Sequence, residues 1–167
     1  YNKTIIQSLK DAVEACPEKQ ALVSFRTETQ EQLSFKYHEI WELTNKIALG
    51  LQQLGIGKDD VVSCQLPNWW EFSLLYFACC RIGAVLNPLM PIFRERELEF
   101  MLKHAESKVF VVPQKYRNFN HENLADKLKQ KIDTLQHVIV INSEGSNNFE
   151  TVLVNHGLDQ DENKLNA

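Results

Sequence analysis

The chain has 167 residues, which is long enough for one domain with a proper core and short for two. Hydrophobic residues make up 44% and charged residues 24%, as in ordinary globular proteins, and the formal net charge is −4. Because no block of Lys and Arg occurs, the composition argues against a nucleic-acid or anionic-membrane partner.

Neither a membrane span nor a secretion signal is expected. The longest apolar run, residues 72–80, is interrupted by Ser73 and falls well below the roughly 20 residues that span a bilayer. The first residues lack the charged-then-apolar pattern of a signal peptide.

The cysteines form no Cys-x-x-Cys pair, and no His lies at zinc-ligand spacing from them. They are Cys16, Cys64, Cys79 and Cys80. Cys64 in its strand and the vicinal pair Cys79-Cys80 in an apolar helix are expected to be small buried hydrophobes rather than redox or metal groups, in a cytoplasmic, reducing compartment.

The first third of the chain predicts a helix, a hairpin and a second helix. Apolar residues at helical spacing predict an opening helix over residues 5–16, which Pro17 ends. Residues 21–25 and 32–35 predict two short strands joined by a polar turn. The second helix ends at Gly55. Its apolar stripe is Ile40, Leu43, Ile47, Leu51 and Leu54.

The middle of the chain predicts a strand followed by a strongly apolar helix. Residues 61–66 form the strand, and residues 69–82 form a helix that is apolar nearly all round and must be covered on most sides. Asn68 is expected to cap this helix with its side-chain oxygen, since Pro67 precedes it and Glu71 follows three residues later.

The remaining pattern alternates strands and helices. In order, the expected elements are a strand at 84–87, an amphipathic helix at 94–105, a strand at 109–112, a helix at 122–132 and a strand at 138–141. This order predicts an α/β layered domain, with a mostly parallel sheet flanked by helices and a short N-terminal hairpin. Residues 1–142 would form the domain. Residues 143–167 read as a polar tail or linker, with one short helix near 149–154.

Ligands of doubly wound sheets gather at the carboxyl ends of strands, and Leu66-Pro67-Asn68 occupies such a position. Trp69 and Trp70 would either line a pocket there or simply pack in the core. The residues alone do not decide between these alternatives.

No other pattern carries a recognisable chemistry. The six glycines form neither Gly-x-Gly-x-x-Gly nor a Gly-Lys-Ser/Thr loop, and no Ser lies in a Gly-x-Ser-x-Gly elbow. The Arg94–Glu97 run is expected to be a solvated face held by local ion pairs. Solvated positions are also expected for His38, His104, His121, His137 and His156.

An ordered set of short motifs goes further than these single residues. The set is Leu33-Ser34-Phe35, Glu39, Leu54-Gly55-Ile56, Asp60-Val61-Val62, Leu66-Pro67-Asn68, Glu71-Phe72, Gly83-Ala84-Val85, Asn87-Pro88, Glu97-Leu98, Met101-Leu102 and Lys108. In order and spacing it resembles the N-terminal part of the adenylate-forming enzymes, which include acyl-CoA synthetases, luciferases and peptide-synthetase adenylation domains. The resemblance covers about residues 4–154.

The resemblance implies a two-step reaction. A carboxylic acid attacks the α-phosphate of Mg-ATP to give an acyl-adenylate, and coenzyme A then displaces AMP to form a thioester. ATP, Mg²⁺ and coenzyme A are the implied cofactors of the parent enzyme, and none is expected to bind tightly to this chain. The family's phosphate loop, magnesium ligand, ribose-binding Asp and catalytic Lys lie downstream of the matched motifs. No catalytic, cofactor-binding or metal residue is therefore assigned, and the substrate-binding residues stay open.

Residues 87–98 resemble most closely the bacterial short- or medium-chain acyl-CoA and cyclohexanecarboxylate-CoA ligases. We expect an N-terminal fragment of such a ligase, inactive alone and prone to self-association through the surface that the missing region would cover. One alternative is a non-catalytic α/β binding module, and another is a fragment of a luciferase- or peptide-synthetase-type enzyme. Whether the gene continues past Ala167, and which acyl chain is used, stay open.

Overall fold

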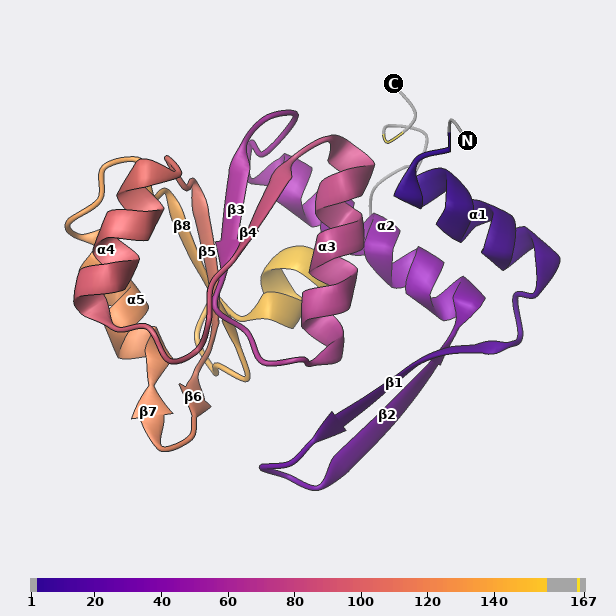
Figure 1. Cartoon of the computed structure of the whole chain (residues 1–167), viewed down its shortest axis with the longest axis horizontal. Helices are drawn as coiled ribbons and strands as arrows, with labels where there is room; N and C mark the ends of the chain where they lie inside the picture. The colour runs from indigo at the N-terminus through magenta and orange to yellow at the C-terminus, as the bar shows by residue number, and fades with distance from the viewer. Residues whose placement is uncertain (1–2, 156–164, 166–167) are drawn as a thin grey trace.

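A computed structural model of the chain describes residues 3–155 and residue 165. In this part, a four-stranded parallel sheet carries helices on both faces, and a separate antiparallel hairpin extends away from it (Figure 1). The predicted α/β class, parallel sheet and N-terminal hairpin are confirmed. The helices are α1 (Ile5–Ala15), α2 (Tyr37–Gln53), α3 (Trp70–Ile82), α4 (Glu95–His104), α5 (His121–Lys129) and the π-helix η1 (Glu150–Asn155). The strands are β1 (Gln20–Arg26), β2 (Glu31–Lys36), β3 (Val61–Cys64), β4 (Val85–Pro88), β5 (Val109–Pro113), β6 (Lys115–Tyr116), β7 (Phe119–Asn120) and β8 (His137–Ile141).

The four-stranded sheet has the order β4-β3-β5-β8, with every neighbouring pair parallel. The chain passes from β3 through α3 to β4 at one edge. It then crosses back through α4 to β5 on the other side of β3, so Val62 lies between Leu86 and Val109. The direction of winding therefore changes between β3 and β5, and doubly wound sheets bind ligands at the carboxyl end of such a point.

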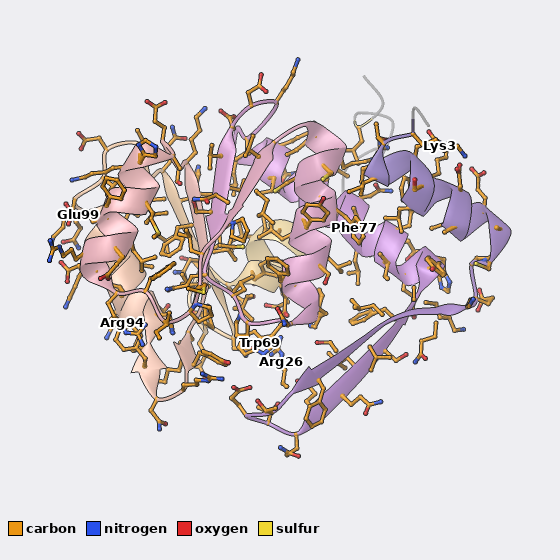
Figure 2. All side chains as sticks on the ribbon, in the orientation of Figure 1. Lys3, Arg26, Trp69, Phe77, Arg94 and Glu99 are labelled. Carbon is orange, nitrogen blue, oxygen red and sulfur yellow. The ribbon has the colours of Figure 1, made fainter. Side chains whose placement is uncertain are left out.

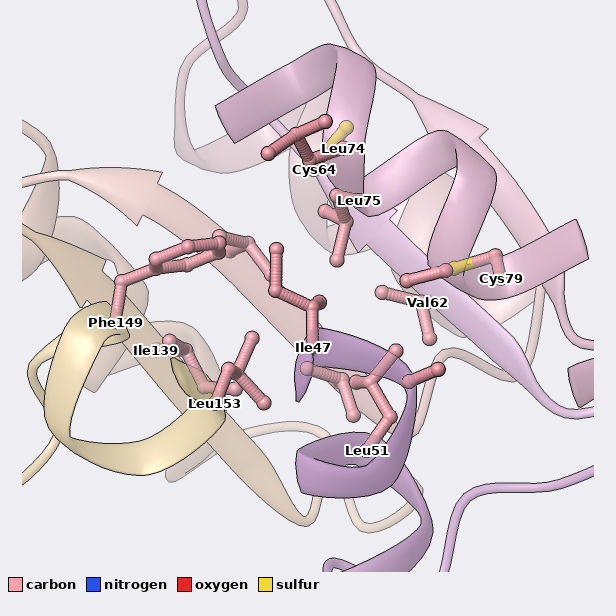
Figure 3. Close-up of a cluster of buried hydrophobic side chains, with 14 of the residues drawn as sticks. Ile47, Leu51, Val62, Cys64, Leu74, Leu75, Cys79, Ile139, Phe149 and Leu153 are labelled. Carbon is pink, nitrogen blue, oxygen red and sulfur yellow. The ribbon is translucent and has the colours of Figure 1, made fainter. Parts of the chain in front are cut away.

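Both faces of the sheet are covered, and β5 shows this most directly. Val109 and Val111 belong to a buried cluster with α2, α3 and η1, whereas Phe110 and Val112 belong to a second cluster with α4 and α5. Figure 3 shows the first cluster, in which side chains of all three helices meet. Because all five residues of β5 are buried, the strand reads as a continuous apolar run rather than an alternating one.

Glycines in the left-handed region end two of the helices. Gly55 follows α2 with φ 79°, as predicted, and the amide of Ile56 donates to the carbonyl of Leu51 at 3.0 Å. Gly83 ends α3 in the same way, with φ 71°. Only glycine adopts this conformation without a Cβ penalty, so both turns are set by residue type.

The predicted cap of α3 is wrong. The helix begins one residue later than Asn68 allows, with Trp69 at the N-cap and no side-chain cap from that residue. The backbone amide of Trp70 instead donates to Oγ of Ser24, at 3.1 Å, from strand β1. The free amide at the start of the helix is thus satisfied by a residue 46 positions earlier, which no local motif reveals.

The short strands β6 and β7 also differ from the prediction. The sequence pattern gave no sign of the short hairpin formed by β6 and β7, whose turn places Arg117 and Asn118 at positive φ.

The helix predicted near 149–154 is confirmed as η1. Phe149 and Leu153 are fully buried against the sheet, while the domain boundary at residue 142 stays a prediction. The polar residues 159–163 lie outside the described residues.

A substitution at Gly50 tests the packing of η1 on α2. A Cβ at this position would lie 2.6 Å from the Cα of Leu153, whereas Gly57 has nothing within 4 Å. Gly to Ala inside a helix ordinarily stabilises by roughly 0.5–1 kcal/mol, but overpacking costs about 1–3 kcal/mol. We expect Gly50→Ala to lower the free energy of unfolding in urea, with Gly57→Ala as the control. An unchanged or raised stability of Gly50→Ala would contradict this contact.

Candidate functional site

The loops that follow β3 and β4, together with the β6–β7 hairpin, border a pocket of about 400 Å³, which we call the strand-end pocket. Its lining residues come from the β3–α3 loop, the β4–α4 loop and the β6–β7 hairpin. They are Leu66, Pro67, Asn68, Met90, Pro91, Ile92, Arg94, Tyr116 and Arg117. The pocket therefore lies beside the point where the sheet changes its winding direction, and Asn68 faces it instead of capping α3.

Two arginines give this pocket its charge. The Nη1 atom of Arg94 donates to the carbonyls of Pro91 and Phe93, each at 2.8 Å, and the guanidinium lies 4.0 Å from the centre of the Phe119 ring. Arg117 comes from the turn of the β6–β7 hairpin. A guanidinium has five N–H donors, so both side chains keep donors for an anionic ligand.

The prediction for the Arg94–Glu97 run is right in part. Glu95 forms an ion pair with Lys131, and Glu97 accepts a hydrogen bond from the backbone amide of Arg94 at 3.2 Å. These contacts suit a solvated first turn. The ion pair of Glu95 is with a residue 36 positions away, however, and is not local. Arg94 is exposed, as predicted, but it packs over an aromatic ring and lines the pocket. Its position depends on the loop and the hairpin, which the local charge pattern does not encode.

The expectation of a solvated His121 is wrong. This side chain is buried, with 1% exposure, and its Nδ1 lies 2.9 Å from Oε1 of Gln65. Burial, and secondarily the charge of Arg94, lower the pKa of His121 to about 4. The imidazole is therefore neutral near pH 7.

The other described histidines lie nearer the surface. His104 is exposed and stacks on Phe100, and His38 is half-buried beside the carbonyl of Pro17. His137 is also half-buried, and burial lowers its pKa. His156 lies outside the described residues. None of these three described side chains lines the strand-end pocket.

The two tryptophans pack in the core rather than line the pocket. Trp69 and Trp70 are 5% and 9% exposed. The Trp70 ring contacts Phe35 of the hairpin and Phe149, with centroid distances of 5.4 and 6.1 Å. Of the two sequence alternatives, the structure supports packing, because the hairpin covers this end of α3.

A buried ion pair holds the β1–β2 hairpin against α3. Arg26 of β1 pairs with Glu71 of α3, and both side chains are almost fully buried. Arg26 also donates to Oδ1 of Asn142 at 3.2 Å and lies 4.4 Å from the centre of the Trp69 ring (Figure 2). Burial raises the pKa of Glu71, and the neighbouring guanidinium offsets that effect only in part. The pair thus joins β1, α3 and the end of β8 at the cost of desolvating two charges.

The prediction of buried cysteines holds for two of the three residues that it concerns. Cys64 and Cys79 are buried, and burial raises the pKa of the Cys64 thiol to about 12 and raises that of Cys79 as well. Cys80 is exposed, contrary to the expectation, and Cys16, which the prediction does not concern, is half-buried. Cys80 lies on the face of α3 that the described elements leave uncovered.

A larger groove, of about 560 Å³, lies between the β1–β2 hairpin, the helices α1, α2 and α3, and strand β4. Its lining is Leu9, Ala21, Leu22, Tyr37, Ile40, Phe72, Ser73, Tyr76, Phe77, Leu86 and Pro88. Because this lining contains no Lys, Arg or His, the groove suits apolar groups and not phosphates. The strand-end pocket is the better candidate for a charged ligand.

Over residues 3–155 and 165, no three His, Cys, Asp or Glu side chains lie close enough together to form a metal-binding cluster. No helix within those residues is long and apolar enough to cross a bilayer.

Comparison with known proteins identifies the class. The sequence profile described as AMP-binding enzyme matches residues 9–166. The chain is 34% identical over 136 residues to a 2-hydroxy-7-methoxy-5-methyl-1-naphthoate–CoA ligase of Streptomyces carzinostaticus, covering 81% of this chain and 23% of that protein. It is 31% identical over 125 residues to a medium-chain fatty-acid–CoA ligase of Escherichia coli (strain K12), covering 75% of this chain and 21% of that protein.

Solved structures give the same fold. A long-chain-fatty-acid-CoA ligase from Archaeoglobus fulgidus superposes with a TM-score of 0.79 at 24% identity, over 92% of this chain and 30% of that one. That ligase therefore shares the doubly wound fold of this chain. The chain belongs to the AMP-binding enzyme family, which confirms the resemblance to adenylate-forming enzymes. It spans less than a quarter of the length of these curated relatives.

Removing Arg26 tests the buried ion pair. Arg26→Met leaves Glu71 charged and buried without its partner, so we expect a loss of about 3–5 kcal/mol in unfolding free energy. Breaking the exposed Lys3–Asp11 pair with Lys3→Met serves as the control and should change little. The double variant Arg26→Met/Glu71→Leu should recover most of the loss in urea unfolding.

The same variant has a pH dependence of known sign. Without Arg26, the folded-state pKa of Glu71 lies still further above the ordinary value of 4.5. The folded state then binds the proton more tightly, so the stability deficit shrinks as pH falls toward 4.5 and grows as pH rises. A deficit that is independent of pH, or unaffected by the second substitution, would show that the pair does not carry this contact.

Proposed function

We propose that this chain is the N-terminal part of an ATP-dependent carboxylate–CoA ligase, which forms an acyl-adenylate and then an acyl-CoA thioester. The family assignment and the CoA-ligase relatives support this proposal. The chain does not catalyse adenylation alone in this proposal, since the sequence contains no phosphate loop and the described residues contain no metal-ligand cluster. We place it in the cytoplasm, on the cysteine pattern.

The observation that carries the CoA half of the proposal is the pair of arginines at the strand-end pocket. Coenzyme A is rich in phosphate, and arginine is the residue best suited to bind it. The resemblance assigns the phosphates of ATP to a loop outside the matched motifs, which leaves coenzyme A as the phosphate-bearing substrate for this pocket. Arg94 and Arg117 would meet its phosphates weakly in this chain and more strongly in a longer protein.

A second candidate is an aryl-acid adenylating enzyme that does not use coenzyme A. The relative that favours it is a 2,3-dihydroxybenzoate-AMP ligase of Bacillus subtilis (strain 168), 34% identical over 106 residues and covering 64% of this chain and 20% of that protein. A panel of fatty and aromatic acids, assayed with and without coenzyme A, separates the two. The non-catalytic binding module stays a further alternative.

ATP–pyrophosphate exchange tests the catalytic part of the proposal. We expect none from the 167-residue chain with any carboxylic acid of the panel, because the groups that stabilise charge at the phosphates are absent from its motifs. Exchange should appear when the coding sequence beyond Ala167, if the reading frame is open, is included. Exchange by the 167 residues alone, or a stop codon directly after Ala167, would contradict the proposal.

Exposed apolar side chains support the further proposal that this chain self-associates by itself. The large ones are Ile5, Val23, Phe25, Tyr76, Val85, Met90, Ile92 and Phe100. Val23 and Phe25 lie on the outer face of β1, where they expose half of their surface. We expect sedimentation velocity to show concentration-dependent association, and Val23→Thr/Phe25→Thr to reduce it. A strictly monomeric wild-type chain at high concentration would rule this out.

A further inference from the structure

Gln65 lies directly beyond β3 and is fully buried, although it is a polar residue. Its Nε2 donates to the carbonyls of Met90 and Phe93, at 2.8 and 3.0 Å. Both partners are carbonyl oxygens, which only accept, so the orientation of the amide is determined. Its Oε1 therefore faces His121, and one side chain is bonded to both the β4–α4 loop and the start of α5.

The amide orientation also determines the tautomer of His121. Because Oε1 of Gln65 only accepts, Nδ1 of His121 must carry the hydrogen and donate across the 2.9 Å contact. Nε2 then carries no hydrogen and presents a lone pair, for which the described part of the chain offers no hydrogen-bond donor. The lowered pKa of His121 agrees with a neutral ring at this position.

These contacts close into a ring beneath the strand-end pocket. Phe93 accepts from both Gln65 and Arg94, and the Arg94 guanidinium lies over Phe119 of the β6–β7 hairpin. The Phe119 ring meets His121 edge-on at 4.9 Å, and His121 returns to Gln65. The β4–α4 loop carries Arg94 and the hairpin carries Arg117, so this ring of contacts connects the two charged sides of the pocket.

We propose that Gln65 and His121 are positioning residues for the strand-end pocket, holding the β4–α4 loop and the β6–β7 hairpin so that Arg94 and Arg117 are presented together to the phosphates of coenzyme A. The ligand in this statement rests on the proposed function, whereas the positioning does not. Loops are otherwise the most mobile parts of a fold, so a buried anchor determines the geometry that they offer a ligand. Neither residue touches the ligand.

The test compares four variants of the 167-residue chain. Gln65→Leu removes all three hydrogen bonds, and His121→Phe removes the donor to Gln65. His121→Asn keeps a donor near the position of Nδ1. Ser63→Ala is the matched control. Ser63 is a buried polar residue of β3 that forms hydrogen bonds with Ser107 and Asn87, and with neither the β4–α4 loop nor the β6–β7 hairpin.

The first measurement is amide hydrogen exchange and needs no ligand. The amide of Phe93 donates to Met90, and that of His121 donates to Gln114, so both are suitable probes. We expect exchange at these amides to rise by about tenfold or more in Gln65→Leu and His121→Phe, beyond any change in Ser63→Ala, and to be restored in His121→Asn. Ring nitrogen shifts should show the Nδ1–H tautomer in wild type from pH 5 to 8. If these amides exchange in Gln65→Leu at the same rate as in wild type, or if wild-type His121 is the Nε2–H tautomer, the positioning role is overturned.

The second measurement is a titration with coenzyme A into the millimolar range. We expect weak binding by wild type and His121→Asn, and a dissociation constant raised by about tenfold in Gln65→Leu, the equivalent of one lost hydrogen bond. Equal binding by Gln65→Leu and wild type would overturn the proposal. If wild type does not bind while the loops loosen as expected, the positioning role stands and the ligand assigned under the proposed function is wrong.

Discussion

The structure depends on covering both faces of a short parallel sheet. All five residues of β5 are buried, and its alternate side chains enter two different clusters, one under α2, α3 and η1 and the other under α4 and α5. Each strand must therefore be followed by a crossover that returns the chain to the same end of the sheet. The loops that leave the strands at their carboxyl ends are brought together by this requirement, and the strand-end pocket lies among them.

Buried polar contacts then decide how the carboxyl end of the sheet is built. The Arg26–Glu71 pair docks the N-terminal hairpin onto α3, and Ser24 of the same hairpin satisfies the first amide of that helix. Gln65 and His121 organise the neighbouring loops. These two groups of contacts are adjacent, because the ring of Trp69 at the start of α3 and the ring of Tyr116 in β6 have centroids 6.0 Å apart. The Arg26–Glu71 ion pair and the strand-end pocket thus lie at the same end of the sheet, where the strands have their carboxyl ends.

Sequence patterns predicted elements whose signals are local. Gly55 ends α2 because a left-handed residue is needed there, and the apolar runs of β5 and β8 are continuous because both strands are buried. The predicted cap of α3 was wrong because the signal is not local: the acceptor for the first helical amide is Ser24, which comes from β1. The β6–β7 hairpin was missed because its strands have two residues each, too short for any periodicity.

The sequence by itself determined the α/β alternation, the end of α2 at Gly55 and the family, because spacing and ordered motifs are properties of the linear chain. Only the tertiary structure decided that Trp69 and Trp70 pack, that His121 is buried and neutral, and that Arg94 and Arg117 line one pocket. Those outcomes depend on partners far apart in the sequence, such as Gln65 with His121, 56 positions later. Hydrogen bonding and desolvation act on distances in space, and no local pattern encodes them.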